Sequence, residues 1–233
     1  MIKKIVHTLV PKAVVERVQR VREQIRNFRS LARDYGQWAT IRDRNSVDEF
    51  GNPIPWYTYP TTEYLSHFNF EQFSVFEFGS GNSTLWWAGR CQSIDSVEDD
   101  QDWHAKISKT LISDSASYLL ETEKEAYISS ASAAADIFVI DGKHRRECAE
   151  EIVKICGGGV MIILDNSDWY PKTATFLRDK LAWVQIDFHG FGPINNYTWT
   201  TSIFLNPIRH QELIYSHSLK PKCGLVQVAA GDY

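Results

Sequence analysis

The chain has 233 residues, of which 43% are hydrophobic and 23% charged, so it can form one sizeable core and is not disordered as a whole. Its 25 Lys and Arg residues against 29 Asp and Glu residues give a net charge of −4, which argues against a globally basic nucleic-acid-binding protein. No apolar run approaches the roughly 20 residues of a membrane span, and no secretory signal pattern or CxxC pair occurs. We therefore expect a cytoplasmic protein that binds no nucleic acid.

Residues 1–44 are the basic part of the chain, with eleven Lys and Arg residues and four acidic ones. A single helix between Pro11 and Gly36 is predicted, because apolar residues recur there in alternating steps of four and three. This apolar seam consists of Val14, Val18, Val21, Ile25, Phe28, Ala32 and Tyr35. Three roles stay open for the helix: packing on its own domain, pairing subunits of a homo-oligomer, or lying on an anionic membrane surface.

From residue 74 onward, short runs rich in Val, Ile and Phe alternate with helical patterns. Five of these runs are separated by enough residues for helical crossovers, which predicts a parallel sheet, and the last two form an antiparallel hairpin at its edge. The expected strands are 74–78, 93–97, 116–120, 136–140, 159–164, 183–188 and 199–205. The prediction is an α/β fold: residues 1–50 form a helical extension, and residues 51–233 form one domain around a seven-stranded, mostly parallel sheet.

A glycine-rich turn follows the first of these strands. Glycines at a strand-to-helix junction let the backbone approach a ligand, and the helix start presents unpaired amide donors. The second strand ends at Glu98, where a carboxylate can accept hydrogen bonds from both hydroxyls of a ribose. Two alternatives need no ligand: the glycines could simply form a tight turn, and Glu98 could belong to a solvated acidic loop. The candidate ligand-binding residues are Glu77, Gly79, Ser80, Gly81, Ser83 and Glu98.

The segment EFGSGNS, followed by VED at the end of the second strand, resembles the cofactor site of the class I S-adenosylmethionine-dependent methyltransferases. The resemblance extends over residues 70 to 206 and implies a Rossmann-like sheet with an antiparallel edge hairpin. It also implies that the glycine-rich turn receives the methionine end of the cofactor and that Glu98 holds the ribose. Ser83 stands where a third glycine is common in that family, and residues 121–125 show no recognisable contact for the adenine.

The fourth and fifth strands end in polar residues that parallel strands bring to one edge of the sheet. Asp141, Asp165 and Asn166 supply oxygen ligands that suit a Mg²⁺-type ion, and helix capping would explain the same two aspartates. The arrangement is similar to metal-dependent O-methyltransferases, which implies these three residues as metal ligands and His144 as the general base. Asp141 also borders the predicted cofactor turn. His144 could equally be a surface residue beside Arg145.

These patterns together predict a methyltransferase, metal-assisted, that acts on a hydroxyl of a small polar or glycan acceptor. Two alternatives are a metal-independent methyltransferase with another acceptor and an NAD-type nucleotide-binding module. Residues 53–60 and 190–197 and the pair Trp169-Tyr170 are expected to border the acceptor, although turn chemistry and core packing explain their composition as well.

Overall fold

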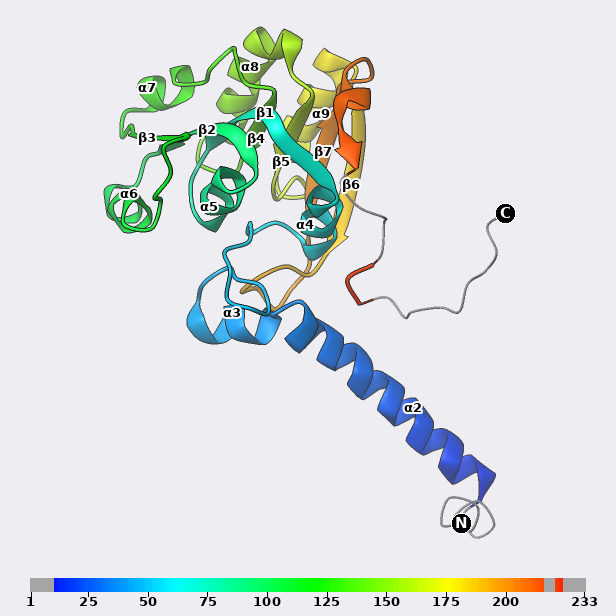
Figure 1. Cartoon of the computed structure of the whole chain (residues 1–233). Coiled ribbons are helices and arrows are strands. Elements are labelled where there is room, and N and C mark those ends of the chain that lie inside the picture. Colours follow the sequence, from blue (N-terminus) through cyan, green and yellow to red (C-terminus); the bar gives the residue numbers. More distant parts are fainter. Residues whose placement is uncertain (1–10, 216–220, 224–233) are drawn as a thin grey trace.

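The computed structural model describes residues 11–215 and 221–223. Its centre is a sheet of eight strands in which seven follow the order β3-β2-β1-β4-β5-β7-β6, with β8 paired to the start of β1 (Figure 1). Strands β1 to β5 are parallel, and β7 runs antiparallel to both β5 and β6. The strands are β1 Phe68–Phe78, β2 Cys91–Glu98, β3 Ala116–Leu120, β4 Ile137–Ile140, β5 Met161–Leu164, β6 Val184–Gly190, β7 Trp199–Leu205 and β8 Ile214–Tyr215.

Helices connect the strands and cover both faces of the sheet. The α-helices are α2 Lys12–Arg29, α3 Gln37–Asp43, α4 Tyr59–Ser66, α5 Asn82–Ala88, α6 Gln101–Ser108, α7 Lys124–Ser129, α8 Arg145–Ile155 and α9 Pro171–Leu181. A π-helical turn, Ser30–Asp34, continues α2, and two short 3-10 helices occupy Cys156–Gly158 and His210–Glu212. No helix in these parts of the chain is both long and apolar enough to cross a membrane.

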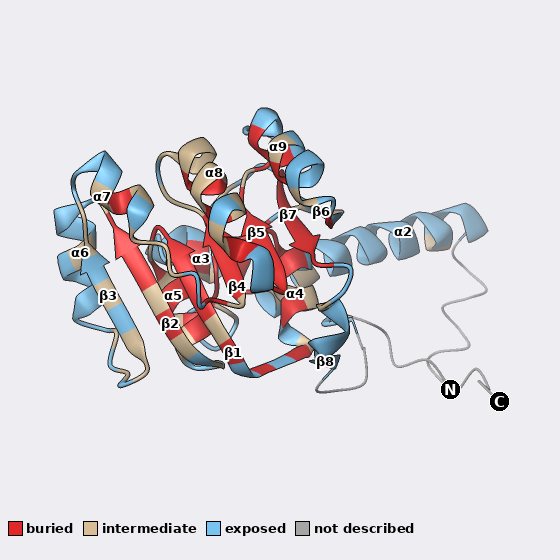
Figure 2. Ribbon diagram, turned by 90° about the horizontal axis from the view of Figure 1, so that it is seen from above, coloured by how far each residue is buried: buried red, intermediate tan, exposed pale blue. Residues whose placement is uncertain are grey.

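The core lies in two layers because successive side chains of a strand point to opposite faces. On β1, Val75 packs in the layer that contains Trp86 and Trp87 of α5, whereas Phe76 packs in the layer that contains Ile152 of α8. The middle strands are buried on both faces (Figure 2), which explains why β4 and β5 are continuous apolar runs.

The predicted α/β fold is confirmed, including the parallel sheet and the antiparallel edge hairpin. Two details differ. Strand β1 begins at Phe68, six residues before the predicted start, because its first part alternates between buried and exposed positions and contains a register shift between Phe70 and Ser74. Strand β8 was not predicted: it is two residues long and pairs with Phe68 and Asn69.

The N-terminal segment forms two helices where one was predicted. The α-helix ends at Arg29, and Gly36 adopts a left-handed conformation (φ 76°) that turns the chain into α3. Helix α3 then contacts the sheet domain, because Gln37 Nε2 donates to Asn195 O (3.2 Å) and Ile194 N donates to Thr40 Oγ1 (2.8 Å). The predicted boundary at residue 50 therefore separates segments that are joined by hydrogen bonds.

Candidate functional site

A cavity of about 610 Å³ lies at the carboxyl ends of the parallel strands, within the usual size range of small-molecule sites. Its walls come from the ends of β1, β2, β4 and β5, from the segment that follows α3, and from the connection between β6 and β7. The residues that line it include Asn45, Trp56, Gly79, Ser80, Gly81, Asn82, Ser83, Glu98, Asp99, Trp103, Asp141, Lys143, Arg145, Asp165, Asn166, Trp169, Asn195, Tyr197 and Trp199.

The glycine-rich turn between β1 and α5 forms one wall of this cavity. Gly79 has φ +88°, and a Cβ there would lie 2.7 Å from the backbone nitrogen of Gly142, so only glycine fits. Gly81 has an extended backbone, and a Cβ there would meet only the Trp103 ring, at 3.7 Å. Its small size leaves room on the cavity side, and its N–H donates to Thr84 Oγ1 (3.0 Å).

Glu77 lies beneath the turn and does not line the cavity. Its Oε2 accepts hydrogen bonds from Thr84 Oγ1 (2.5 Å) and Ser96 Oγ (3.2 Å). Because Thr84 also accepts from Gly81 N, Glu77 supports the shape of the turn from below. Burial raises the pKa of Glu77 to about 7.

This raised pKa predicts a pH-dependent stability. The folded chain binds the Glu77 proton more tightly than the unfolded chain, so stability is highest below the unfolded pKa and falls as pH rises through about 7. A Glu77→Gln variant should lose less stability than the wild type between about pH 5 and pH 8, by as much as about 3 kcal/mol. Urea unfolding at both pH values measures the difference. An equal loss in both proteins would contradict the raised pKa.

Glu98, at the end of β2, presents a fixed carboxylate to the cavity. Its Oε1 accepts from the backbone N–H groups of Asp99 and Asp100 (both 3.0 Å), and its Oε2 accepts from Ser80 Oγ (2.6 Å). Ser80 in turn shares a hydrogen bond with Tyr118 of β3 (2.6 Å). A carboxylate held on both oxygens keeps one orientation, and its Oε2, which accepts only from Ser80, retains a further lone pair for a ligand hydroxyl.

Two neighbours of Glu98 complete this wall and were not predicted. Trp103 lines the cavity, and its Nε1 donates to Ser80 O (2.8 Å). Asp99 forms an ion pair with Lys143 (2.7 Å), which joins the end of β2 to the loop after β4. Trp103 lies in the first turn of α6, where Asp100 caps the helix by accepting from its backbone N–H (2.8 Å).

The predicted metal ligands are brought together, but the space among them holds the guanidinium of Arg145. This side chain is only 9% exposed and donates to Asp141 Oδ1 (3.1 Å) and Asn166 Oδ1 (3.0 Å). It also donates to the backbone oxygens of Asp141, Gly142 and Asp165. Two of these five acceptors, Asp141 Oδ1 and Asn166 Oδ1, are side-chain oxygens of predicted metal ligands.

A divalent ion does not fit this arrangement, because the positively charged guanidinium of Arg145 would repel it. Among residues 11–215 and 221–223, no group of three or more His, Cys, Asp or Glu residues is arranged to hold a metal ion. The predicted metal set of Asp141, Asp165 and Asn166 is therefore not supported. The sequence placed Arg145 beside His144 and gave no sign that its side chain turns inward.

Asp165 is a buried carboxyl that lines the cavity. Its Oδ1 accepts from Thr201 Oγ1 (2.5 Å) and from Trp199 Nε1 (3.0 Å), both on β7. Burial, reinforced by the negative charge of Asp141, raises the pKa of Asp165 well above its ordinary value. A carboxyl with this pKa and position can accept a proton from a bound ligand near neutral pH.

His144 does not line the cavity. It adopts a left-handed conformation (φ 52°) at the start of α8, and its ring packs edge-on against Tyr127 of α7 with 6.3 Å between the ring centroids. Lys143, the residue before it, faces the cavity instead. This placement does not support His144 as a general base.

Each segment expected to border an acceptor contributes at least one residue to the cavity wall, although Tyr170 does not line the cavity. Trp56, Trp169 and Tyr197 all line it, and the rings of Trp169 and Tyr197 lie 6.1 Å apart. The segment after α3 closes the cavity from the side of α5, where Asn82 Nδ2 donates to Asn45 Oδ1 (3.0 Å). The cavity thus has a glycine and carboxylate wall at one end and an aromatic wall at the other.

Comparison with solved structures shows the same fold in a known enzyme. Precorrin-6y C5,15-methyltransferase from Geobacter metallireducens matches with a TM-score of 0.52 and 12% identity, over 71% of this chain and 95% of that one. An rRNA methylase from Streptococcus thermophilus has a TM-score of 0.47 at 15% identity, over 62% of this chain and 92% of that one. The N-methyltransferase NodS from Bradyrhizobium japonicum, in complex with S-adenosylhomocysteine, has a TM-score of 0.42 at 16% identity, over 58% of this chain and 78% of that one.

No protein-family model and no curated protein sequence matches the chain. At this level of identity the precorrin-6y methyltransferase shows the fold alone. The chain has the Rossmann-like α/β fold of that enzyme, with the antiparallel strand β7 between β5 and β6.

Proposed function

We propose that the protein is an S-adenosylmethionine-dependent O-methyltransferase that acts on a hydroxyl of a sugar or another small polar acceptor. The observation that carries this proposal is one cavity with two chemically different ends. Gly79, Gly81 and the carboxylate of Glu98 lie at one end, and the buried carboxyl of Asp165 lies beside aromatic rings at the other.

The residues at the first end fit S-adenosylmethionine. The glycine-rich turn leaves its backbone accessible to the methionine part, Ser83 lies in the first turn of α5, and Glu98 Oε2 can accept a hydrogen bond from a ribose hydroxyl. The ring of Trp103 and the carboxylate of Asp99 also line the cavity near Glu98. When bound, the cofactor supplies an electrophilic methyl group on a sulfonium.

The sheet order favours this cofactor over NAD. A dinucleotide-binding sheet has the order 3-2-1-4-5-6, whereas here β7 is inserted between β5 and β6 and runs antiparallel to both. The turn also lacks the third glycine of the dinucleotide fingerprint, since Thr84 stands at that position. Thr84 is instead bonded to Glu77 and Gly81.

Asp165 is the best-placed general base. Methyl transfer forms a bond from carbon to the acceptor oxygen and breaks the bond from carbon to sulfur, so the acceptor hydroxyl must lose its proton. Thr201 and Trp199 hold the Asp165 carboxylate in place, and its raised pKa makes it a stronger base than an exposed aspartate. Arg145 orients Asp141 and Asn166 at the same edge of the cavity.

The aromatic end favours a sugar-like acceptor. Trp56, Trp169 and Tyr197 present flat apolar faces, which can stack on the C–H faces of a sugar ring while Asn195 and Asp165 are available for its hydroxyls. Trp169 and Tyr197 are substantially exposed, so the faces of their rings are accessible to a ligand.

Activity should not depend on a divalent ion, because the guanidinium of Arg145 binds side-chain oxygens of Asp141 and Asn166, two of the three predicted metal ligands. Methyl transfer measured after exhaustive treatment with EDTA should match the untreated rate, and added Mg²⁺ or Mn²⁺ should not raise it. A rate lost in EDTA and restored by either ion would contradict this arrangement of Arg145.

The proposal is tested by transfer of a labelled methyl group from S-adenosylmethionine to a panel of sugars, glycosides, amines and phenols. We expect incorporation into a sugar or glycoside that contains a free hydroxyl. Incorporation only into amines would overturn the O-methyltransferase assignment while leaving the cofactor assignment intact. A variant with Trp169→Ala should bind S-adenosylhomocysteine normally and show a higher KM for the acceptor.

A further inference from the structure

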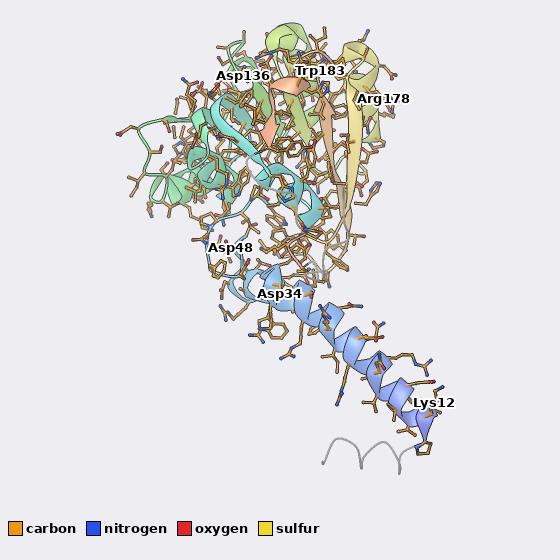
Figure 3. The ribbon with its side chains drawn as sticks, turned by 45° about the vertical axis from the view of Figure 1, so that its right-hand side comes forward. Lys12, Asp34, Asp48, Asp136, Arg178 and Trp183 are labelled. Atoms are coloured by element: carbon orange, nitrogen blue, oxygen red, sulfur yellow. The ribbon has the colours of Figure 1, made fainter. Side chains whose placement is uncertain are left out.

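Helix α2 has no partner in the part of the chain that the structure describes. None of its residues is buried, and it extends away from the sheet domain along its whole length (Figures 1 and 2). Lys12 marks its far end, and Asp34 lies where the chain reaches the domain (Figure 3). The structure therefore contradicts the first of the three predicted roles, in which this helix packs on its own domain.

The apolar seam of α2 is exposed to solvent. Its five members within the helix are between 46% and 64% exposed: Val14, Val18, Val21, Ile25 and Phe28. Their spacing places them on one side of the helix. Further along, Tyr35 does pack on the domain, with its ring 4.9 Å from that of Tyr59, so the chain is anchored beyond the end of the helix. A contiguous apolar stripe of this kind marks an interaction surface.

The charges of α2 are arranged around this seam. Its two acids, Glu16 and Glu23, are seven residues apart and lie opposite the seam, at heptad position f. Five arginines lie between the seam and the acids or directly beside the seam: Arg17, Arg20, Arg22, Arg26 and Arg29. The ten preceding residues, which the structure does not describe, add Lys3 and Lys4 and no acid.

A second copy of the helix does not match this charge pattern. In a two-helix coiled coil, the positions beside the seam face the partner helix, and here they include Arg17, Arg22 and Arg29 but no acid. A parallel pair would place Arg17 of one copy against Arg22 of the other. Pairing of subunits through this seam would therefore bring like charges together without compensation.

We propose that α2 docks on the surface of an anionic phospholipid membrane. The seam would enter the boundary between headgroups and acyl chains, and the arginines would reach the lipid phosphates while their aliphatic stems cover the rim of the seam. The two acids would then face away from the membrane. The apolar seam favours a membrane over RNA, because Val, Ile and Phe find no apolar environment on a phosphate backbone.

Sedimentation of the full-length chain with vesicles tests the proposal. Binding to vesicles of equal parts phosphatidylcholine and phosphatidylglycerol should be at least about tenfold tighter than to phosphatidylcholine alone and should weaken as salt is added. The double variant Val21→Asp and Ile25→Asp should lose this binding. The matched control, Gln19→Asp and Asn27→Asp, adds the same charge on the other side of the helix and should retain most of it.

Three outcomes would overturn membrane docking: wild-type binding that does not depend on anionic lipid, seam and control variants that bind equally, or a wild-type dimer that only the seam variant dissociates. The last result would show that a second copy covers the seam. Because every substituted residue is exposed, thermal melts of both variants should match the wild type, and cofactor binding should be unchanged.

Discussion

Replacing Asp165 with Asn is expected to lower the rate of methyl transfer by about 10² to 10⁴, the usual contribution of a positioned general base. Asn keeps the shape of the side chain, and its Oδ1 can still accept the hydrogen bonds from Thr201 and Trp199. The wild-type rate should rise with pH through the raised pKa of Asp165, because only the deprotonated carboxylate accepts the acceptor's proton. Single-turnover rates over a range of pH, at saturating S-adenosylmethionine, measure both effects.

His144→Ala is the matched comparison for this prediction. His144 lies against Tyr127 and outside the cavity, so the variant should keep the wild-type rate and pH profile. A silent Asp165→Asn variant together with a slow His144→Ala variant would reverse the assignment of the base. Affinity for S-adenosylhomocysteine should be unchanged in both variants, which separates a lost base from a damaged cofactor site.

Replacing Glu98 with Ala should weaken S-adenosylhomocysteine binding by roughly 10- to 100-fold, as expected for lost hydrogen bonds to a charged group. The carboxylate lines the cavity and is the group best placed to accept hydrogen bonds from a ribose. The variant also removes the acceptor for Ser80 Oγ and for two backbone N–H groups, so a modest fall in stability is expected. Calorimetric titration measures the affinity, and a thermal melt measures the stability.

Asp102→Ala is the control for Glu98→Ala. Asp102 is an exposed acid in the first turn of the neighbouring helix α6 and does not line the cavity. Its loss should leave the dissociation constant unchanged. If Glu98→Ala binds as tightly as this control, the carboxylate does not hold the ribose.

The sequence predicted the sheet well because burial leaves a strong pattern. Strands β4 and β5 are buried on both faces and therefore appear as unbroken apolar runs, and the long connections between them require parallel pairing. The start of β1 and the whole of β8 were not predicted. They pair with each other through only two residue pairs, and so short a strand shows no apolar pattern in the sequence.

The positions of the glycine-rich turn and of Glu98 beside the cavity could also be predicted, because parallel strands end at one edge of the sheet. The contacts of Asp141, Asn166 and His144 could not. The side chain that occupies the space among the oxygens at the strand ends is determined by rotamers, which the sequence does not reveal. Here Arg145 points into that space and donates to Asn166, whereas the ring of His144, one residue earlier, packs against Tyr127. His144 also adopts a left-handed backbone conformation, which no residue pattern indicates.

Calorimetric titration of the purified full-length chain with S-adenosylhomocysteine, and in parallel with NAD, distinguishes the proposed cofactor from a dinucleotide. We expect one site per chain for S-adenosylhomocysteine, a markedly weaker affinity in Glu98→Ala, and no measurable binding of NAD. Binding of NAD with no response to S-adenosylhomocysteine would contradict the proposed cofactor and identify the cavity as a dinucleotide site.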